Sequence, residues 1–131
     1  MSNALAVLHS ALEEADRRDV QRCSRNVVAD GSYDNPATGP TDRAGIGAFH
    51  AALFKAFPDV RYAIERALGD DRLAVAECTV SGTHQDTFAG IPATGRTIHT
   101  SVAFSIEVSE GKETAWRSHF DPAAMIRQLT A

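Results

Sequence analysis

The sequence predicts one α+β domain in which helices cover one face of a bent, mostly antiparallel sheet. Apolar residues recur at helical spacing in the first half, whereas the second half alternates apolar and polar residues in runs separated by turns. The 131 residues, 44% of them hydrophobic, fit a single domain over 1–131 that buries a real core. Helices followed by consecutive strands are typical of α+β folds, and this arrangement encloses a cavity.

The first helix is amphipathic. Ser2 or Asn3 can cap it, and the apolar residues behind that cap recur at helical spacing: Leu5, Leu8, Leu12 and Ala15. A short second helix is predicted from a cap at Asp19 to about Arg25. The first helix therefore has one apolar side to lay against the rest of the domain.

An extended segment separates these helices from a longer one. The stretch "NVVADGSYDNP" is predicted to be extended until Pro36 and Gly39 break it. The longer helix fits residues 42–57, begins at Asp42 and ends before Pro58. Its apolar stripe consists of Ile46, Phe49, Leu53 and Phe57.

Four strands follow one another and predict an antiparallel meander. They read "VRYAIERAL", "RLAVAECTVSGTH", "RTIHTSVAFSIEV" and "TAWRSHF", with turns at "GDD" and "SEGK". Asp121 then stands at an N-cap position with Pro122 at the first helical position, so a short apolar helix is predicted after the strands.

Charge and composition argue against several classes of partner. The net charge of −4 comes from 17 acidic and 13 basic residues that are scattered along the chain, and no basic stripe suggests nucleic-acid binding. No run approaches the ~20 apolar residues of a membrane span, and the N-terminus lacks a secretion signal. Cys23 and Cys78 read as buried, reduced thiols. We therefore expect a cytoplasmic protein.

Several motifs of enzyme chemistry are absent. The chain has no GxSxG elbow, HExxH pair or Walker loop, and "GIGAFH" stops short of a GxGxxG fingerprint. Hydride transfer and phosphoryl transfer therefore lack support.

A set of short motifs, taken in order, resembles the SnoaL-like polyketide cyclases, also called ester cyclases. The motifs are "AFPD" (56–59), "GTH" (82–84), "FAGIPATGR" (88–96), "W" (116), "FD" (120–121) and "RQL" (127–129). The resemblance covers residues from about 45 to 129. It implies the cone-shaped fold of nuclear transport factor 2 and ketosteroid isomerase, often dimeric, with a cofactor-free pocket between the helices and the concave sheet.

The resemblance also implies a role for Asp121. In the cyclases of this family, an aspartate after the last strand is the general acid and base of an intramolecular aldol ring closure, and Asp121 occupies that motif position. An ordinary helix cap is the alternative. The family pattern often includes a histidine beside an acidic residue in the early strand, whereas this chain has Tyr33, Asp34 and Asn35 there.

Two histidines are further catalytic candidates. His119 precedes Asp121 by two residues, so both side chains project from one face of a regular strand, where an imidazole could share a proton with the carboxylate. A solvent-exposed strand histidine is the alternative. Trp116, Ser118 and Phe120 take the opposite face, where we expect the aromatic rings to pack in the core or in a dimer contact.

His84 ends a predicted strand, on the same side as Ala76, Cys78, Val80 and Gly82, so it is expected at the rim of the apolar face. It could donate to a carbonyl or enolate oxygen, or it could only anchor the loop that follows. Phe88 and Ile91 in that loop are predicted to form an apolar lip. The predicted substrate-binding residues are Tyr33, Asp34, Phe49, Phe57, Phe88 and Ile91.

A metal site built from His84, His119 and Asp121 has no specific ligand spacing, so no metal is expected. The preferred function is a cofactor-independent cyclase or isomerase that acts on a hydrophobic, carbonyl-rich small molecule, in a homodimer. Two alternatives stay open: a non-catalytic domain that binds a small ligand or assembles with a partner, and a hydratase or epoxide hydrolase whose carboxylates activate water.

Overall fold

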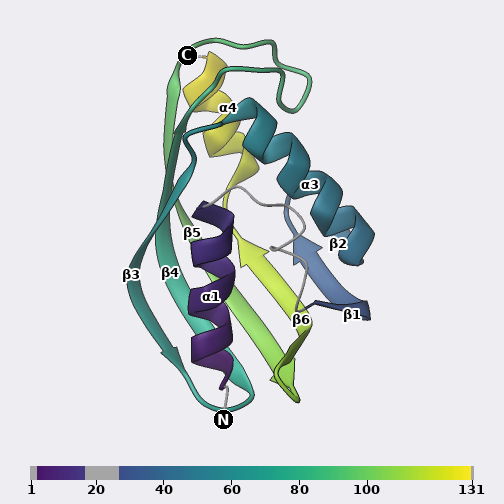
Figure 1. Ribbon diagram of the computed structural model, residues 1–131. Helices are drawn as coiled ribbons and strands as arrows, with labels where there is room; N and C mark the ends of the chain where they lie inside the picture. Colours follow the sequence, from purple (N-terminus) through teal and green to yellow (C-terminus); the bar gives the residue numbers. More distant parts are fainter. Residues whose placement is uncertain (1–2, 17–26, 131) are drawn as a thin grey trace.

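A computed structural model describes residues 3–16 and 27–130 and confirms the α+β class (Figure 1). In this part of the chain the helices are α1 (Ala4–Asp16), α3 (Arg43–Ala56) and α4 (Pro122–Thr130). All of them lie on the same side of a curved sheet (Figure 1). The short helix predicted between Asp19 and Arg25 lies outside the described residues.

The sheet of the described chain has six strands in the order β2-β1-β6-β5-β4-β3. The strands are β1 (Val27–Asn35), β2 (Gly39–Thr41), β3 (Arg61–Gly69), β4 (Leu73–Thr83), β5 (Thr97–Ser109) and β6 (Lys112–His119). Strands β3 to β6 form the predicted antiparallel meander. Strand β1 adds to the other edge of β6 in parallel, which makes the sheet mixed.

The sheet bends because its strands are long and irregular. Strand β4 has 11 residues and β5 has 13, and the register shifts once between β3 and β4 and once between β5 and β6. An extra residue on one strand bends that strand and increases its twist. Alternate residues of β4 and β5 face the helices and are buried, among them Ala76, Cys78 and Phe104.

Helix α3 begins and ends where the sequence predicts. The Asp42 side chain accepts a hydrogen bond from the Gly45 backbone N–H at 2.9 Å, so Asp42 is the N-cap. Ile46 and Leu53 are buried on the apolar stripe, and Phe57 just past the helix is fully buried. Helix α3 therefore packs one side against the sheet and leaves the other side to solvent.

The "FPD" and "GTH" motifs meet in space. Asp59 accepts two hydrogen bonds from Thr83, one from the backbone N–H and one from the hydroxyl, each at 2.7 Å. Gly82 lies so close to Phe57 that a Cβ atom built there would be 3.2 Å from the Phe57 Cβ. The His84 ring stacks on the Phe57 ring with centroids 5.4 Å apart. These motif residues therefore join the end of α3 to the end of β4.

The outer face of the sheet is not covered by the described helices. It exposes Leu68, Leu73 and Val75, with Leu68 80% exposed and paired across the strands with Val75. None of the described helices is long and apolar enough to cross a membrane.

We expect Asp59→Ala to lower the free energy of unfolding by about 1–2 kcal/mol, because Thr83 loses both of its hydrogen-bond acceptors. Urea denaturation followed by circular dichroism measures this change. Asp71→Ala, which removes an exposed carboxylate from the β3–β4 turn, is the matched control and should leave stability within ~0.5 kcal/mol. Equal stability of both variants would contradict a bracing role for Asp59.

Candidate functional site

Two adjacent pockets, which we call the two lobes of the cavity, lie between the helices and the concave face of the sheet. The α1 lobe has a cavity volume of about 40 Å³ and is lined by Ala11, Leu12, Ala15, Tyr33, Ile46, His50, Tyr62, Phe104, Glu113 and Trp116. The α4 lobe has a cavity volume of about 50 Å³ and is lined by Asn35, Phe49, His50, Leu53, Tyr62, Val80, Ile98, Thr100, Val102, Phe104, Trp116, Ser118, Phe120 and Met125. Four side chains line both lobes: His50, Tyr62, Phe104 and Trp116.

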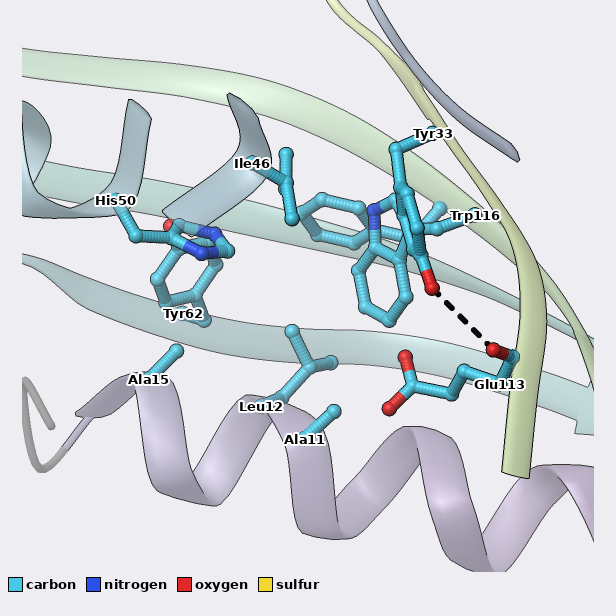
Figure 2. A pocket seen from close by; sticks show the side chains of 10 residues that line it. Ala11, Leu12, Ala15, Tyr33, Ile46, His50, Tyr62, Glu113 and Trp116 are labelled. Carbon is cyan, nitrogen blue, oxygen red and sulfur yellow. Dashed lines mark hydrogen bonds between the residues drawn. The ribbon is translucent and has the colours of Figure 1, made fainter. Parts of the chain in front are cut away.

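The α1 lobe ends in a polar pair, Tyr33 and Glu113. The Tyr33 hydroxyl donates to the Glu113 backbone carbonyl at 3.2 Å, and both residues are almost fully buried. Figure 2 shows the Glu113 carboxylate and the Tyr33 hydroxyl at the same end of the lobe. Burial, reinforced by the charge of Glu113, raises the pKa of Tyr33 well above its usual value. Tyr33 therefore stays protonated and acts as a hydrogen-bond donor.

His50 stands where the two lobes meet. It comes from α3, and its ring stacks on Phe54 with centroids 5.6 Å apart and planes 6° from parallel. Burial lowers the pKa of His50 from 6.5 to about 4, because the cavity disfavours the charged imidazolium. The imidazole is neutral at pH 7, and no hydrogen bond to a described residue occupies it, so it is available to a ligand.

His50 was missed by the sequence analysis, although a signal for it existed. It follows Ile46 by four residues and precedes Phe54 by four, so it falls on the buried side of α3. A polar residue on an apolar helical stripe is a candidate for a cavity-lining group. Glu113 carried no such signal, because its burial depends on which face of β6 the helices cover.

The α4 lobe is apolar except for a few neutral polar groups. Asn35 Oδ1 accepts from the Ala37 backbone N–H at 2.8 Å, and Trp116 Nε1 donates to Ser118 Oγ at 3.0 Å. Trp116 and Phe120 pack against the hydrophobic core, as one of the two predicted alternatives has it, and they also line this lobe. The face of β6 that carries them is the face turned toward the helices.

Asp121 is an N-cap of α4. Its carboxylate accepts from the backbone N–H groups of Ala123 at 3.0 Å and Ala124 at 3.3 Å, and lies 3.7 Å from Arg127. The side chain is 62% exposed and lines neither lobe. The capping role is thus observed, whereas the catalytic role of Asp121 stays a prediction.

His119 and Asp34 point away from the cavity. His119 is exposed and lines a shallow depression on the outer face of the sheet, beside Glu65 and Glu77. The Asp34 carboxylate lies 4.0 Å from Arg117 Nε, and both side chains are more than 40% exposed. Alternation along each strand explains both positions, since the neighbours Tyr33 and Ser118 face the cavity.

His84 is buried and anchors the loop that follows β4. Its Nδ1 accepts from the Thr94 backbone N–H at 3.3 Å and lies 3.0 Å from the Thr94 hydroxyl. Its own backbone pairs with Arg96 and Gly95. His84 lines neither lobe, so its geometry matches the loop-anchoring alternative.

The loop anchored by His84 carries Phe88 to a surface depression that shares Phe49, Phe120 and Met125 with the α4 lobe. Phe88 makes edge-on ring contacts with Phe49 and Phe57, and its backbone pairs with Ile91. This depression, which we call the mouth, is lined by Ala37, Thr38, Phe49, Phe88, Ala89, Phe120, Pro122, Met125, Ile126 and Leu129. Phe49 lines both the mouth and the α4 lobe. Phe57 contacts the ring of Phe88, and Ile91 pairs with the Phe88 backbone.

The candidate metal ligands do not converge. His84 is buried behind the loop, His119 is on the outer face, and Asp121 caps α4. Within residues 3–16 and 27–130, no three His, Cys, Asp or Glu side chains are placed to hold a metal ion.

The three described helices that cover one face of a curved six-stranded sheet, with a largely apolar cavity between them, define the nuclear transport factor 2-like fold. The model of the SnoaL-like polyketide cyclases matches residues 6–129, so the chain belongs to that family. No curated protein matches the sequence.

Solved structures share the fold over nearly the whole chain. AclR of Streptomyces galilaeus, a proposed hydroxylase, is 18% identical with a TM-score of 0.86, and the match covers 95% of this chain and 93% of AclR. IdmH of Streptomyces antibioticus, a proposed polyketide cyclase, is 22% identical with a TM-score of 0.81 and coverages of 95% and 96%. An LEH-like epoxide hydrolase of M. tuberculosis is 17% identical with a TM-score of 0.74 and coverages of 97% and 89%. Identities this low establish a shared fold and leave the reaction open.

We expect acid to destabilise the protein through His50. The unfolded chain binds a proton at this histidine below pH 6.5, whereas the folded protein binds it only below about 4. Stability is therefore highest above pH 6.5 and falls between pH 6.5 and 4, by up to about 3 kcal/mol for this group. His50→Gln should flatten the pH dependence of the unfolding free energy in that window.

The matched control is His9→Gln, which changes an exposed histidine of α1. Urea unfolding of the wild type, His50→Gln and His9→Gln at several pH values measures how the unfolding free energy of each depends on pH. An unchanged pH dependence in His50→Gln would show that the imidazole is not desolvated.

Proposed function

We propose that this protein is a cofactor-independent cyclase or isomerase that acts on a hydrophobic, carbonyl-rich small molecule in the two-lobed cavity. Membership in the SnoaL-like polyketide cyclase family supports the substrate class. Apolar walls with a few neutral polar groups suit a largely apolar molecule that carries oxygen functions. The polar groups at the two ends and at the junction would orient it.

The neutral imidazole of His50 is the observation that carries the proposal. Aldol ring closure and carbonyl isomerisation both begin with removal of a proton alpha to a carbonyl, and a base must be unprotonated to accept it. His50 is unprotonated at pH 7 and lines both lobes. An enolate that forms beside it would raise its proton affinity, since an opposite charge favours the imidazolium.

Asp121 is the base that the family resemblance implies, so His50 and Asp121 are two candidates for the same proton transfer. A catalytic carboxyl works best when it is desolvated beside the substrate, because this brings its pKa toward the working pH. The Asp121 carboxylate is 62% exposed and engaged at the start of α4. We therefore assign the proton transfer to His50, and the following experiment compares both residues.

Exchange of alpha protons in D2O tests the assignment without the natural substrate. With 2-tetralone as a simple carbonyl probe, we expect wild-type protein to speed deuterium uptake, and His50→Gln to lower that rate by ~10²-fold or more. Asp121→Asn should exchange normally, because asparagine also caps a helix. NMR follows the exchange.

Asp121→Ala is the control for the cap and should cost about 1 kcal/mol of stability without a change in exchange rate. Loss of exchange in Asp121→Asn with normal exchange in His50→Gln would return catalysis to Asp121. Binding of the probe without any exchange in wild-type protein would favour the non-catalytic alternative.

Water activation is a second candidate, and the buried Glu113 carboxyl favours it. The carboxylates first considered for this role, Asp34 and Asp121, are both partly exposed and outside the cavity lining. Glu113 instead faces the α1 lobe beside the Tyr33 hydroxyl (Figure 2). A hydratase or epoxide hydrolase could use Glu113 to activate water for attack on its substrate.

We also propose that the protein forms a homodimer through the outer face of the sheet, where Leu68, Leu73 and Val75 are exposed. We expect a dimer at micromolar concentration by light scattering and a shift to monomer in Leu68→Lys, which places a charge in this patch. Ile126→Lys is the matched control, since Ile126 is an exposed apolar residue of α4. A wild-type protein that is monomeric throughout the micromolar range would contradict the proposal.

A further inference from the structure

Two buried polar residues stand side by side at the wall of the α4 lobe. Asn35 is the last residue of β1 and Ser118 is near the end of β6, and each is 5% exposed. The parallel register pairs Tyr33 with Trp116 and Asp34 with Arg117, so the next position on each strand brings Asn35 beside Ser118. Both residues line the α4 lobe. They are thus neighbours on one face of two adjacent strands.

The hydrogen bond to Ala37 fixes the orientation of the Asn35 amide. A backbone N–H can only donate, so the Asn35 atom that accepts from Ala37 at 2.8 Å is Oδ1. The Nδ2 amino group is then left with two N–H donors, and no acceptor for them is found among the described residues. Asn35 therefore offers a donor, and not an acceptor, to the lobe.

Ser118 is constrained in a similar way by Trp116. The indole N–H is a donor only, so Ser118 Oγ is the acceptor in the 3.0 Å bond between them. The hydroxyl proton of Ser118 remains free to donate, and within the described chain no acceptor receives it. An oxygen atom placed between the two groups would give each of these donors an acceptor.

We propose that Asn35 Nδ2 and Ser118 Oγ form an oxygen-binding pair that holds the ligand's carbonyl oxygen in the α4 lobe. An sp² oxygen has two lone pairs and can accept from both donors at once. No lysine or arginine lines this lobe, and His50 is neutral, so the pair selects an uncharged carbonyl over a carboxylate. The pair also strengthens its hold as the oxygen gains negative charge in an enolate.

This assignment rests on the proposed function, because it assumes that the cavity takes a carbonyl compound. Held at this pair, the carbonyl lies in the same lobe as His50, which would take the proton from the adjacent carbon. The carbonyl oxygen then becomes the enolate oxygen, and the proton resides on the His50 imidazole until it is returned to carbon. Asn35 and Ser118 supply hydrogen bonds and exchange no proton in this step.

Binding of two matched probes tests the pair independently of turnover. 2-Tetralone and tetralin have nearly the same shape and differ by the carbonyl group, and isothermal titration calorimetry measures the affinity for each. We expect wild-type protein to prefer the ketone. Ser118→Ala and Asn35→Asp should each weaken ketone binding by roughly fivefold or more, the worth of one hydrogen bond, and leave tetralin binding unchanged.

Asn35→Asp keeps an acceptor for Ala37 and replaces the amino group with a carboxylate oxygen, so it keeps the turn while it removes the donor to the ligand. Ser101→Ala, the same change at an exposed position of β5, is the matched control. Equal affinity of wild-type protein for both probes, or a ketone preference that survives in both variants, overturns the oxygen-binding pair and leaves the cavity function standing. Failure of both probes to bind would overturn the cavity function and the pair together.

Discussion

Tyr33 and Glu113 stand 80 positions apart in the chain, yet the Tyr33 hydroxyl donates to the Glu113 carbonyl because β1 runs parallel to β6. Most polar groups of the cavity depend on this pairing, since β1 supplies Tyr33 and Asn35 while β6 supplies Glu113 and Ser118. A slip of one residue would turn the whole cavity-facing set of β1 toward the outer face. The hydrogen bond from Tyr33 and the burial of its ring resist that slip.

The "AFPD" and "GTH" motifs make structural contacts between the end of α3 and the end of β4. Phe57 and Asp59 at the end of α3 contact Gly82, Thr83 and His84 at the end of β4. His84 is in turn hydrogen-bonded to Thr94 in the following loop. The same loop carries Phe88, whose ring contacts Phe49 of α3. None of these motif residues lines either lobe, so the contacts observed for them are structural.

The low polarity of the cavity determines which protonation states its residues hold. Burial lowers the pKa of His50 and raises that of Tyr33, so both are neutral at pH 7. Neutral groups can accept or donate protons without the cost of a buried charge in the resting protein. In such surroundings a charge interacts more strongly with neighbouring groups than it would in water.

The sequence by itself determined the α+β class, the three described helices and the meander, because these follow from local periodicity, caps and turns. Alternation also placed residues 116, 118 and 120 on one face of the last strand and residue 119 on the other, but it could not say which face is turned toward the helices. That choice was made by the helices, which cover one face of the sheet and leave the other open (Figure 1). The neutral state of His50 and the meeting of Asn35 with Ser118 were likewise decided only by tertiary structure, since each arises between elements distant in the chain.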